Sequence, residues 1–346
     1  MKVYFLTKYH REGPSSRYRS FNYIRYFENA GLNPEYRPLF YEGYVSDIYQ
    51  SKRSVKKIIF SYLKRMWFLL QPVNKSSFFI IEKELFPGVP GFIEKLLLFN
   101  KKYSIDYDDA VFTRYEKNLF LKNKHLSIGK KARLITVGNH WYFSQFPPDK
   151  TNCVYLPTVI DQHKYPEKKY AENPVPVICW IGTPSNMNYV QQIIPVFKHL
   201  QKKGIDFIIR VIGAEIVHPD IKIENLKWNE DKEYEYLASS DIGIMPLNNT
   251  KWEKGKCGFK IIQYMISGIP VIASPSPANL EIINKKELGY IASNDNTWMK
   301  SLEKLLRDAE LRKKIGNEGR SYIKKNYSYH VWGPKYAALI KKESNK

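Results

Sequence analysis

Residues 256–274 read KCGFKIIQYMISGIPVIAS and combine a loop, a helix and a buried strand in immediate succession. Apolar side chains recur at helical spacing from Phe259 to Ile266, and Gly268 is a residue at which helices end. The apolar run 271–273 is typical of a strand in the middle of a parallel sheet. This stretch predicts an α/β protein in which the helix begins near Gly258.

The first turn of this predicted helix has the character of an anion-binding site. Free backbone N–H groups and the positive end of the helix dipole favour a negative ligand, yet this turn carries Lys260. A bound anion would resolve the conflict, and Gln263, one turn further along the same ridge, would reach the same ligand. The alternative is that Lys260 is an ordinary exposed lysine in a lysine-rich chain.

The composition indicates two domains and a basic surface. The chain has 346 residues, 43% of them hydrophobic, which is enough for two separate cores. Its formal charge is +21, and residues 1–150 hold 26 basic and 13 acidic side chains, a balance of +13. Such an excess suits nucleic acid, an anionic membrane surface or phosphorylated small molecules, and charge alone does not choose among them.

Cysteine usage and hydropathy narrow the class of protein. Cys153, Cys179 and Cys257 are far apart and form no C-x-x-C pair, which argues against a disulfide framework or a zinc site. The N-terminal residues run directly into a strand pattern without a signal-peptide core, and no run of about 18 apolar residues occurs. We therefore expect a cytoplasmic protein without a membrane-spanning segment.

Residues 2–29 predict a strand, a short loop and an aromatic-rich helix that begins near Arg17. The loop lacks the G-x-G-x-x-G pattern of dinucleotide-binding proteins, but Ser15 or Ser16 is suited to cap the helix. Arg17 and Arg19 would stand at the positive end of this helix, where they would again favour an anion.

Acidic residues follow two further predicted strands. Glu84 comes shortly after the strand over 77–81, and Asp108 and Asp109 directly follow the strand over 103–107. In open α/β sheets the carboxyl ends of parallel strands face the ligand. These three carboxylates are therefore candidates for the reaction centre, with a solvated loop as the alternative.

The second half of the chain repeats this organisation. A strand over 175–181 leads into a loop of small residues over 182–186 and then into a helix over 187–200. A loop with Ser or Asn at a helix start is suited to hold phosphate. Strands and helices then alternate, which favours two doubly wound parallel sheets facing each other across a cleft, with a hinge over 157–172.

Residues 55–70 predict a basic amphipathic helix. The predicted apolar face consists of Val55, Ile59, Tyr62, Met66 and Leu69, with Lys57 and Lys64 opposite. We interpret this face first as one that covers a sheet, and the alternative is that it lies on a membrane surface. A second basic cluster favours a membrane or is simply a solvated face; it consists of Lys122, Lys124, His125, Lys130, Lys131 and Arg133.

Six short motifs in combination resemble the retaining glycosyltransferases of family 4, which have the GT-B fold, and the likeness runs from Lys2 to about the last helix. The motifs are EGPSSRYR at 12–19, DYDDA at 106–110, VGN at 137–139, WIGTPSN at 180–186, DIGIMPL at 241–247 and CGFKIIQYM at 257–265. The resemblance implies two Rossmann-like domains, one that binds the acceptor over 1–157 and one that binds a nucleotide-sugar over 158–325. A last helix over 326–346 would pack back on the first domain.

The resemblance also implies an activity: a sugar moves from a nucleotide-sugar to a glycan or lipid-linked acceptor, with retention of configuration and without a metal ion or other cofactor, as in bacterial surface-polysaccharide synthesis. The enzyme would work in the cytoplasm or peripherally on the inner, anionic membrane face, and it would bind no nucleic acid. The implied donor-binding residues are Gly13, Gly182, Thr183, Pro184, Ser185, Asn186, Gly213, Gly258, Phe259, Lys260 and Gln263. The catalytic candidates are Arg17, Asp108, Asp109 and Lys260, and the acceptor-side candidates are Glu84, Asn139 and His140.

Two departures from the family pattern matter. Many relatives carry two glutamates eight positions apart, where this chain has Gly255 and Gln263, with Glu253 nearby. Relatives also often have an Arg and a Lys around the first C-terminal loop, whereas residues 182–188 contain neither. Lys260 is then the expected group that neutralises the leaving diphosphate. A phosphate oxygen is expected to take the acceptor proton, so no protein nucleophile is required.

Three alternatives remain open at this stage. Asp106 and Asp108 form a D-x-D, the pattern of manganese-dependent glycosyltransferases of another fold, but alternate strand residues need not reach one ion. A basic, tyrosine-rich chain also suits a nucleic-acid-binding protein without catalytic activity. A nucleotide-sugar epimerase of similar fold would need acid and base residues around the sugar and no acceptor.

Overall fold

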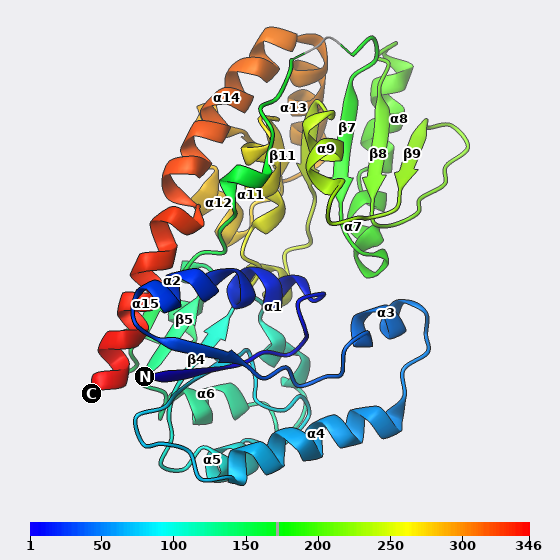
Figure 1. Ribbon diagram of the computed structural model, residues 1–346. Coiled ribbons are helices and arrows are strands. Elements are labelled where there is room, and N and C mark those ends of the chain that lie inside the picture. Colours follow the sequence, from blue (N-terminus) through cyan, green and yellow to red (C-terminus); the bar gives the residue numbers. More distant parts are fainter. Residues whose placement is uncertain (171–172) are drawn as a thin grey trace. The chain divides into compact units, whose positions relative to one another are not determined.

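The computed structural model describes residues 1–170 and 173–346, and contacts between residues divide the chain into two compact units (Figure 1). Unit 1 comprises Met1–Val159, Gly255–Cys257 and Tyr329–Lys346, and unit 2 comprises Ile160–Lys254 and Gly258–Ser328. The predicted hinge over 157–172 ends on two residues, 171 and 172, that lie outside the described ones. No helix of the described residues is long and apolar enough to span a lipid bilayer.

Unit 1 is built on one parallel sheet with the strand order β2-β1-β3-β4-β5-β6. Its strands are β1 (Lys2–Leu6), β2 (Asn33–Tyr36), β3 (Phe78–Glu82), β4 (Lys102–Tyr107), β5 (Leu134–Val137) and β6 (Cys153–Tyr155). Its helices are α1 (Pro14–Arg19), η1 (Phe21–Tyr23), α2 (Ile24–Asn29), α3 (Tyr44–Tyr49), α4 (Val55–Leu70), α5 (Gly91–Leu97), η2 (Val111–Tyr115), α6 (Lys124–Gly129), η3 (His140–Ser144) and α15 (Tyr329–Asn345).

Helices cover both faces of this sheet because its strands are apolar on both sides. Val3, Phe5 and Ile80 point to a core that also holds Phe27 of α2 and Tyr336 of α15. The last helix of the chain is therefore part of the core of unit 1. On the opposite face, α4 packs through an aromatic side chain against rings of β1 and β3.

Unit 2 holds a second parallel sheet with the order β12-β11-β10-β7-β8-β9. Its strands are β7 (Val177–Ile181), β8 (Ile208–Ile212), β9 (Ile223–Leu226), β10 (Ile242–Met245), β11 (Val271–Ala273) and β12 (Tyr290–Ile291). Its helices are η4 (Gln162–Lys164), η5 (Pro184–Asn186), α7 (Met187–Gln191), α8 (Ile194–Lys202), α9 (Glu233–Ala238), α10 (Lys251–Lys254), α11 (Phe259–Ile266), α12 (Pro277–Ile282), η6 (Lys286–Leu288), α13 (Asp295–Arg307) and α14 (Ala309–Asn326).

Alternate residues of β7 enter two different cores, which makes this sheet doubly wound. Cys179 and Ile181 lie in the core that α11 and α14 cover. Ile178 and Trp180 lie in the core that α8 and α13 cover. Two predictions are confirmed: each unit is a Rossmann-like domain built on a parallel sheet, and the last helix returns to the first unit.

Two helices differ from their predicted form. The helix expected from Arg17 to Asn29 is divided into α1, η1 and α2, because Ser20 leaves the helical region with φ −131° and ψ −70°. The helix expected over 187–200 is divided before α8, whose first turn holds Pro195. Proline has no N–H and its ring clashes with the preceding turn, so a continuous helix cannot pass through it without strain.

The predicted apolar face of α4 is right for the buried Leu69 and the half-buried Tyr62, and wrong for its other three members. Val55, Ile59 and Met66 are exposed, whereas the buried side chains of this helix are Ser61, Arg65 and Leu69. The helix does cover the sheet, but through a different face. Helix α4 carries apolar residues on both sides, and the periodicity of the sequence alone therefore did not identify its buried face.

Candidate active site

The loop after β7 is a point of close backbone approach in unit 2. A Cβ atom on Gly182 would overlap the Trp180 ring and would lie 3.1 Å from Nζ of Lys260. Gly213, at the end of β8, has φ +86°, and a Cβ there would lie 2.6 Å from the carbonyl oxygen of Gly182. Gly182 and Gly213 are therefore both required as glycines. Gly213 is required for a second reason, because residues with a side chain rarely adopt a positive φ.

Lys260 stands beside this loop, as the second residue of α11. The helix begins at Gly258, which is left-handed with φ +68°, as the sequence predicts for the helix start. The ammonium nitrogen of Lys260 lies 4.8 Å from the centre of the fully buried Trp180 ring. A cation held at a helix N-terminus opposes the helix dipole, so this turn is prepared for a negative ligand.

Further predicted donor-binding residues lie within this loop and at the start of α11. The hydroxyl oxygens of Thr183 and Ser185 are 2.9 Å apart, and the Asn186 amide donates to Thr183 Oγ1 at 2.9 Å. Pro184 is exposed, and Phe259 is half-buried against the core under α11. The loop is thus shaped by hydrogen bonds among its own side chains.

Gln263 has a different environment from Lys260. Its side chain is buried, and its Nε2 donates to Oε1 of Glu233 at 3.0 Å. The second oxygen of Glu233 accepts from the indole N–H of Trp228 at 2.6 Å. The predicted contact of Gln263 with ribose stays a prediction, and the structure adds a buried carboxylate as its partner.

Glu253, the glutamate nearest to the expected family position, is also buried and engaged. One carboxylate oxygen accepts from the Tyr189 hydroxyl at 2.5 Å, and the other accepts from the backbone N–H of Thr250 at 3.2 Å. Burial alone would raise the pKa of Glu253, but hydrogen bonds from Thr250 and Tyr189 outweigh it and lower the pKa below its ordinary value.

A polar group that the sequence patterns did not predict lies at the end of β11. The Asn279 amide donates to the carbonyl oxygen of Ser274 at 2.8 Å. Asn279 Oδ1 and Ser276 Oγ are buried and have no hydrogen-bond partner among the described residues. A Cβ on Gly258 would lie 3.5 Å from Asn279 Oδ1, so this group adjoins the start of α11. The sequence SPSP at 274–277 directly follows a central strand, and this position could have indicated the polar group.

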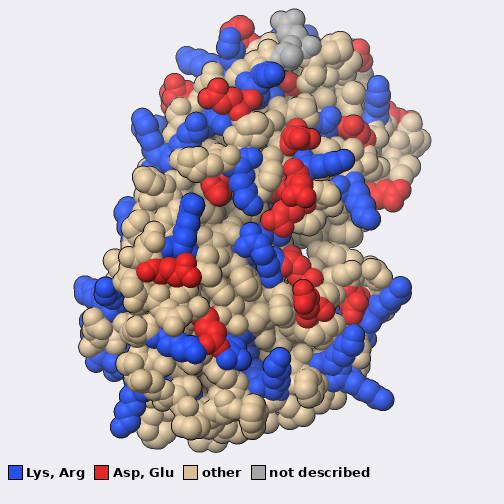
Figure 2. Space-filling view, viewed as in Figure 1, with Lys and Arg blue, Asp and Glu red and all other residues tan. Residues whose placement is uncertain are grey.

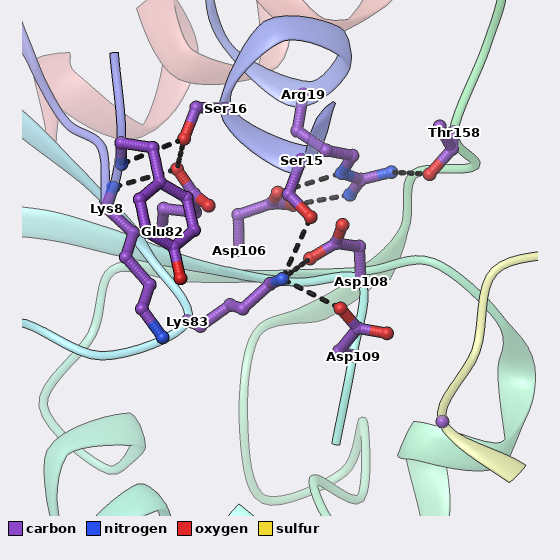
Figure 3. Close-up of polar contacts among 12 residues, drawn as sticks. Lys8, Ser15, Ser16, Arg19, Glu82, Lys83, Asp106, Asp108, Asp109 and Thr158 are labelled. Carbon is purple, nitrogen blue, oxygen red and sulfur yellow. Dashed lines mark hydrogen bonds and ion pairs between the residues drawn. The ribbon is translucent and has the colours of Figure 1, made fainter. Parts of the chain in front are cut away.

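In unit 1, the predicted carboxylates Asp108 and Asp109 meet at Lys83, which sequence analysis missed (Figure 3). Lys83 Nζ lies 3.0 Å from Asp108 Oδ1 and 2.8 Å from Asp109 Oδ2, and it donates to the Ser15 hydroxyl at 2.9 Å. Lys83 directly follows β3 and has a left-handed backbone with φ +61°, a conformation rare outside glycine. The position of Lys83 directly after a predicted strand was the feature of the sequence that could have indicated its role.

These ion pairs favour the charged forms of Lys83 and Asp108. Burial opposes the charged form of Lys83, but Asp108 and Asp109 outweigh it and raise the pKa of the ammonium group well above its ordinary value. Burial would raise the pKa of Asp108, yet Lys83 and Arg19 outweigh burial and lower it. An ionised Asp108 with a lowered pKa is a weak base, so the cluster is better suited to orient a hydroxyl than to remove its proton.

The predicted role of Arg19 required a free guanidinium group at a helix end. In the structure this group is paired instead. Its guanidinium forms a two-point ion pair with Asp106, with Nε donating to Oδ2 at 2.8 Å (Figure 3). Arg19 also donates to the carbonyl oxygen of Leu156 at 2.7 Å, and Thr136 donates to Asp106 at 2.6 Å. The two carboxylates of the D-x-D motif therefore bind two different cations, Arg19 and Lys83.

The predicted serine cap of the first helix is wrong. Helix α1 begins at Pro14 after Gly13, and no side chain caps it. Ser16 instead donates to Oε2 of the buried Glu82 at 2.7 Å, and the backbone N–H of Lys8 donates to the same oxygen at 3.0 Å. The other oxygen of Glu82 has no hydrogen-bond partner among the described residues, and burial raises the pKa of this carboxyl group.

The remaining unit 1 candidates are spread around this cluster. A Cβ on Gly13 would lie 2.5 Å from Cβ of Tyr9, so tight packing requires glycine there. Arg17 is buried with its guanidinium carbon 4.9 Å from the centre of the Tyr18 ring. His140 is exposed and stacks on Tyr155 with ring centres 4.4 Å apart.

Asn139 has a structural role that the sequence did not predict. Its side chain is fully buried, its Oδ1 accepts from the backbone N–H of Trp141 at 2.9 Å, and its amide donates to the carbonyl oxygen of Lys256 at 2.8 Å. The Tyr142 hydroxyl donates to the neighbouring carbonyl of Gly255 at 2.8 Å. These bonds attach segment Gly255–Cys257 to unit 1.

Glu84 lines a pocket near the carboxyl ends of β3 and β4. It belongs to a second buried cluster of charged residues that lines the same pocket. Lys124 Nζ lies 3.1 Å from Glu84 and 2.8 Å from Glu94, both through carboxylate oxygens. Burial raises the pKa of Glu94 to about 7 and lowers that of His125, another lining residue, to about 4. Because Lys124 is buried, its predicted place in an exposed basic cluster is wrong.

Comparison with known proteins agrees with this architecture. The chain superposes on an Anabaena protein, HepE, solved with UDP and glucose, with a TM-score of 0.71, 10% identity and coverage of 99% of this chain and 100% of that one. It superposes on a glycosyltransferase from Rickettsia africae with a TM-score of 0.70, 15% identity and coverage of 99% and 98%. At such identities the likeness shows the fold, which is the GT-B fold of glycosyltransferases.

Residues 161–322 match the family model described as Glycosyl transferases group 1. Over 157 residues the chain is also 24% identical to a Yarrowia lipolytica protein, GDP-Man:Man(3)GlcNAc(2)-PP-Dol alpha-1,2-mannosyltransferase, with coverage of 45% of this chain and 22% of that protein. The chain spans less than a quarter of the length of the curated relatives that it matches. The family model thus matches a little under half of the chain, almost all of it in unit 2, while the solved structures show the fold of both units.

Proposed function

We propose that this protein is a retaining glycosyltransferase that takes a sugar from a nucleotide-sugar donor and transfers it to a glycan or lipid-linked acceptor, without a metal ion. The observation that supports this proposal most is Lys260, a cation beside Gly182 at the start of α11. A leaving diphosphate carries negative charge that grows in the transition state, and a fixed cation with nearby N–H groups stabilises it.

Unit 2 holds the donor in this proposal. The loop 182–186 and Gly213 leave the backbone open to a close ligand, and the matched family segment covers the same region. Solved structures of similar fold contain UDP or UDP-glucose, which makes a uridine nucleotide the first donor class to test.

Unit 1 holds the acceptor. The Lys83 cluster presents Asp109, whose side chain is 29% exposed, next to the buried Asp108, which forms an ion pair with Lys83. Asp109 is the member of the cluster that a hydroxyl reaches from solvent, so we assign it the orientation of the acceptor. The acceptor proton passes to a donor phosphate oxygen, and Asp108 keeps Lys83 in place.

A donor screen tests the proposal. The protein is mixed with UDP-, GDP- and ADP-sugars, and the melting temperature is measured, because a ligand of the native state must raise it. Hydrolysis of the stabilising donor without acceptor, with the anomeric configuration read by NMR, then tests retention. Turnover that survives a chelator supports the metal-free reaction, and loss of turnover restored by Mn²⁺ refutes it. Conversion of the donor to its epimer without acceptor would support an epimerase instead.

A further inference from the structure

Helix α4 of unit 1 presents an apolar face to solvent. Six of its large apolar side chains are each more than half exposed: Val55, Ile59, Phe60, Leu63, Trp67 and Leu70. Since a helix turns about 100° per residue, these six positions fall within an arc about 140° wide. Lys56 lies inside this arc, and Lys64 and Lys57 lie about 40° and 60° beyond its edge. All three lysines are exposed.

The orientation of this face is fixed by buried polar contacts on the other side of the helix. The guanidinium of Arg65 donates to the carbonyl oxygens of Thr7 at 2.6 Å and Leu85 at 3.3 Å, and also to that of Arg37. The hydroxyl of Tyr62 donates to the carbonyl oxygen of Pro87 at 2.9 Å. Rotation of α4 about its axis would break these bonds in a buried site, so the apolar face stays outward.

A second helix extends this surface. Helix α5 contacts α4, and its Phe92 and Leu96, one turn apart, are exposed. Phe99, just after α5, is exposed as well. In Figure 2 the lower rim of unit 1, where Figure 1 draws α4 and α5, is mainly tan with basic side chains at its edges. Apolar patches of this extent on a soluble surface mark sites of interaction.

The charge around the patch favours an anionic partner. Between Asp47 and Glu82 the chain has seven basic residues and no acidic one. A second copy of this chain would bring the same positive surface against itself, which is repulsive. An anionic lipid surface offers both a hydrocarbon layer for the apolar side chains and negative headgroups for the lysines.

We propose that the α4–α5 face docks on an anionic lipid bilayer, with α4 lying in the plane of the interface. Its apolar side chains enter the boundary between headgroups and acyl chains, and Lys56, Lys57 and Lys64 contact the headgroups. This docking surface uses none of the residues assigned to donor or acceptor. It therefore stands whether or not the protein transfers a sugar.

Flotation with vesicles tests the docking. The full chain is mixed with vesicles of phosphatidylglycerol and phosphatidylcholine or of phosphatidylcholine alone, and the bound fraction is measured at low and high salt. The variant Ile59→Ser/Leu63→Ser/Trp67→Ser should bind the anionic vesicles at least tenfold more weakly, because three large apolar side chains no longer enter the lipid. The control Val217→Ser replaces an apolar residue of unit 2 that is even more exposed, and this variant should bind as the wild type does.

The lysines and Trp67 provide separate readouts. Replacing Lys56, Lys57 and Lys64 by Gln should weaken binding to anionic vesicles by about fivefold per lysine, with little change on neutral vesicles. Acyl chains brominated near the headgroup should quench the wild-type fluorescence, and Trp67→Phe should remove most of that quenching while it preserves binding. Equal binding of wild type and the triple serine variant would overturn the proposal. A wild type that instead forms dimers in sedimentation, with the serine variant monomeric, would assign the face to a second copy.

Discussion

The ammonium nitrogen of Lys260 lies 4.8 Å from the centre of the Trp180 ring, so a residue of β7 positions a cation of α11. The indole is fully buried, and its N–H has no hydrogen-bond partner among the described residues. The ring is therefore held by packing and not by a hydrogen bond of its N–H group. Its uncharged face contacts the ammonium group of the lysine. This contact holds the ammonium group at the start of α11, where we propose that the diphosphate binds.

Replacing Lys260 by Ala should lower donor turnover by about a hundredfold or more, since one charge-stabilising group is lost from the transition state. The melting temperature should change little. The matched control is Lys304→Ala, because Lys304 also lies over an aromatic ring, that of Tyr290, at 5.6 Å but on α13. Near-normal turnover of the Lys260 variant would remove this residue from the mechanism.

Gln263→Glu should destabilise the protein at neutral pH. The amide lies 3.0 Å from a carboxylate oxygen of Glu233, so the substitution places two acidic groups together in a buried site. We expect a loss of about 2 kcal/mol or more in unfolding free energy at pH 7, which becomes smaller in acid, where one group is protonated. Denaturant unfolding at pH 5 and pH 7 measures it, with the exposed Gln192→Glu as control. An unchanged stability at pH 7 with tighter donor binding would instead favour the ribose contact.

Lys83→Met should cost about 3–5 kcal/mol, because it leaves Asp108 as an unpaired buried charge. Asp109→Asn should cost much less, because that side chain is partly exposed. Adding Asp108→Asn to Lys83→Met should recover part of the loss, and a double-mutant cycle from denaturant unfolding measures the coupling. Strictly additive effects would contradict the ion pair.

Glu94 should make the protein less stable as pH rises from about 5 to 7. Burial raises its pKa in the folded protein to about 7, above the value in the unfolded chain. A raised pKa means that the folded state holds the proton longer, so this contribution is complete below the unfolded pKa and is lost as pH passes through the folded pKa.

The difference in melting temperature between Glu94→Gln and wild type measures this contribution. The amide does not titrate, so this difference should grow in favour of the variant from pH 5 to pH 7. Glu28→Gln, at an exposed position of α2, should show no such trend. A constant difference across this range would mean that Glu94 keeps an ordinary pKa.

Local patterns predicted the parts of the fold that depend on neighbours in the sequence. The helix after Gly258, the strand after it and both parallel sheets follow from periodicity and strand-end rules. The Lys83 cluster did not, because its members come from positions far apart and meet only when β1, β3 and β4 pair. The outward face of α4 depends on Arg65 and three distant carbonyl groups, which no periodic pattern encodes.

The division of the chain into units has a consequence for the order in which they form during synthesis. Unit 1 begins at Met1, but its core includes Tyr336, Ala337 and Ile340 of α15. The ribosome therefore completes every residue of unit 2 before the last part of the first unit emerges. The N-terminal part of unit 1 is therefore synthesised first, but its core is completed last. During that interval its apolar strands depend on chaperones or on transient structure for protection against aggregation.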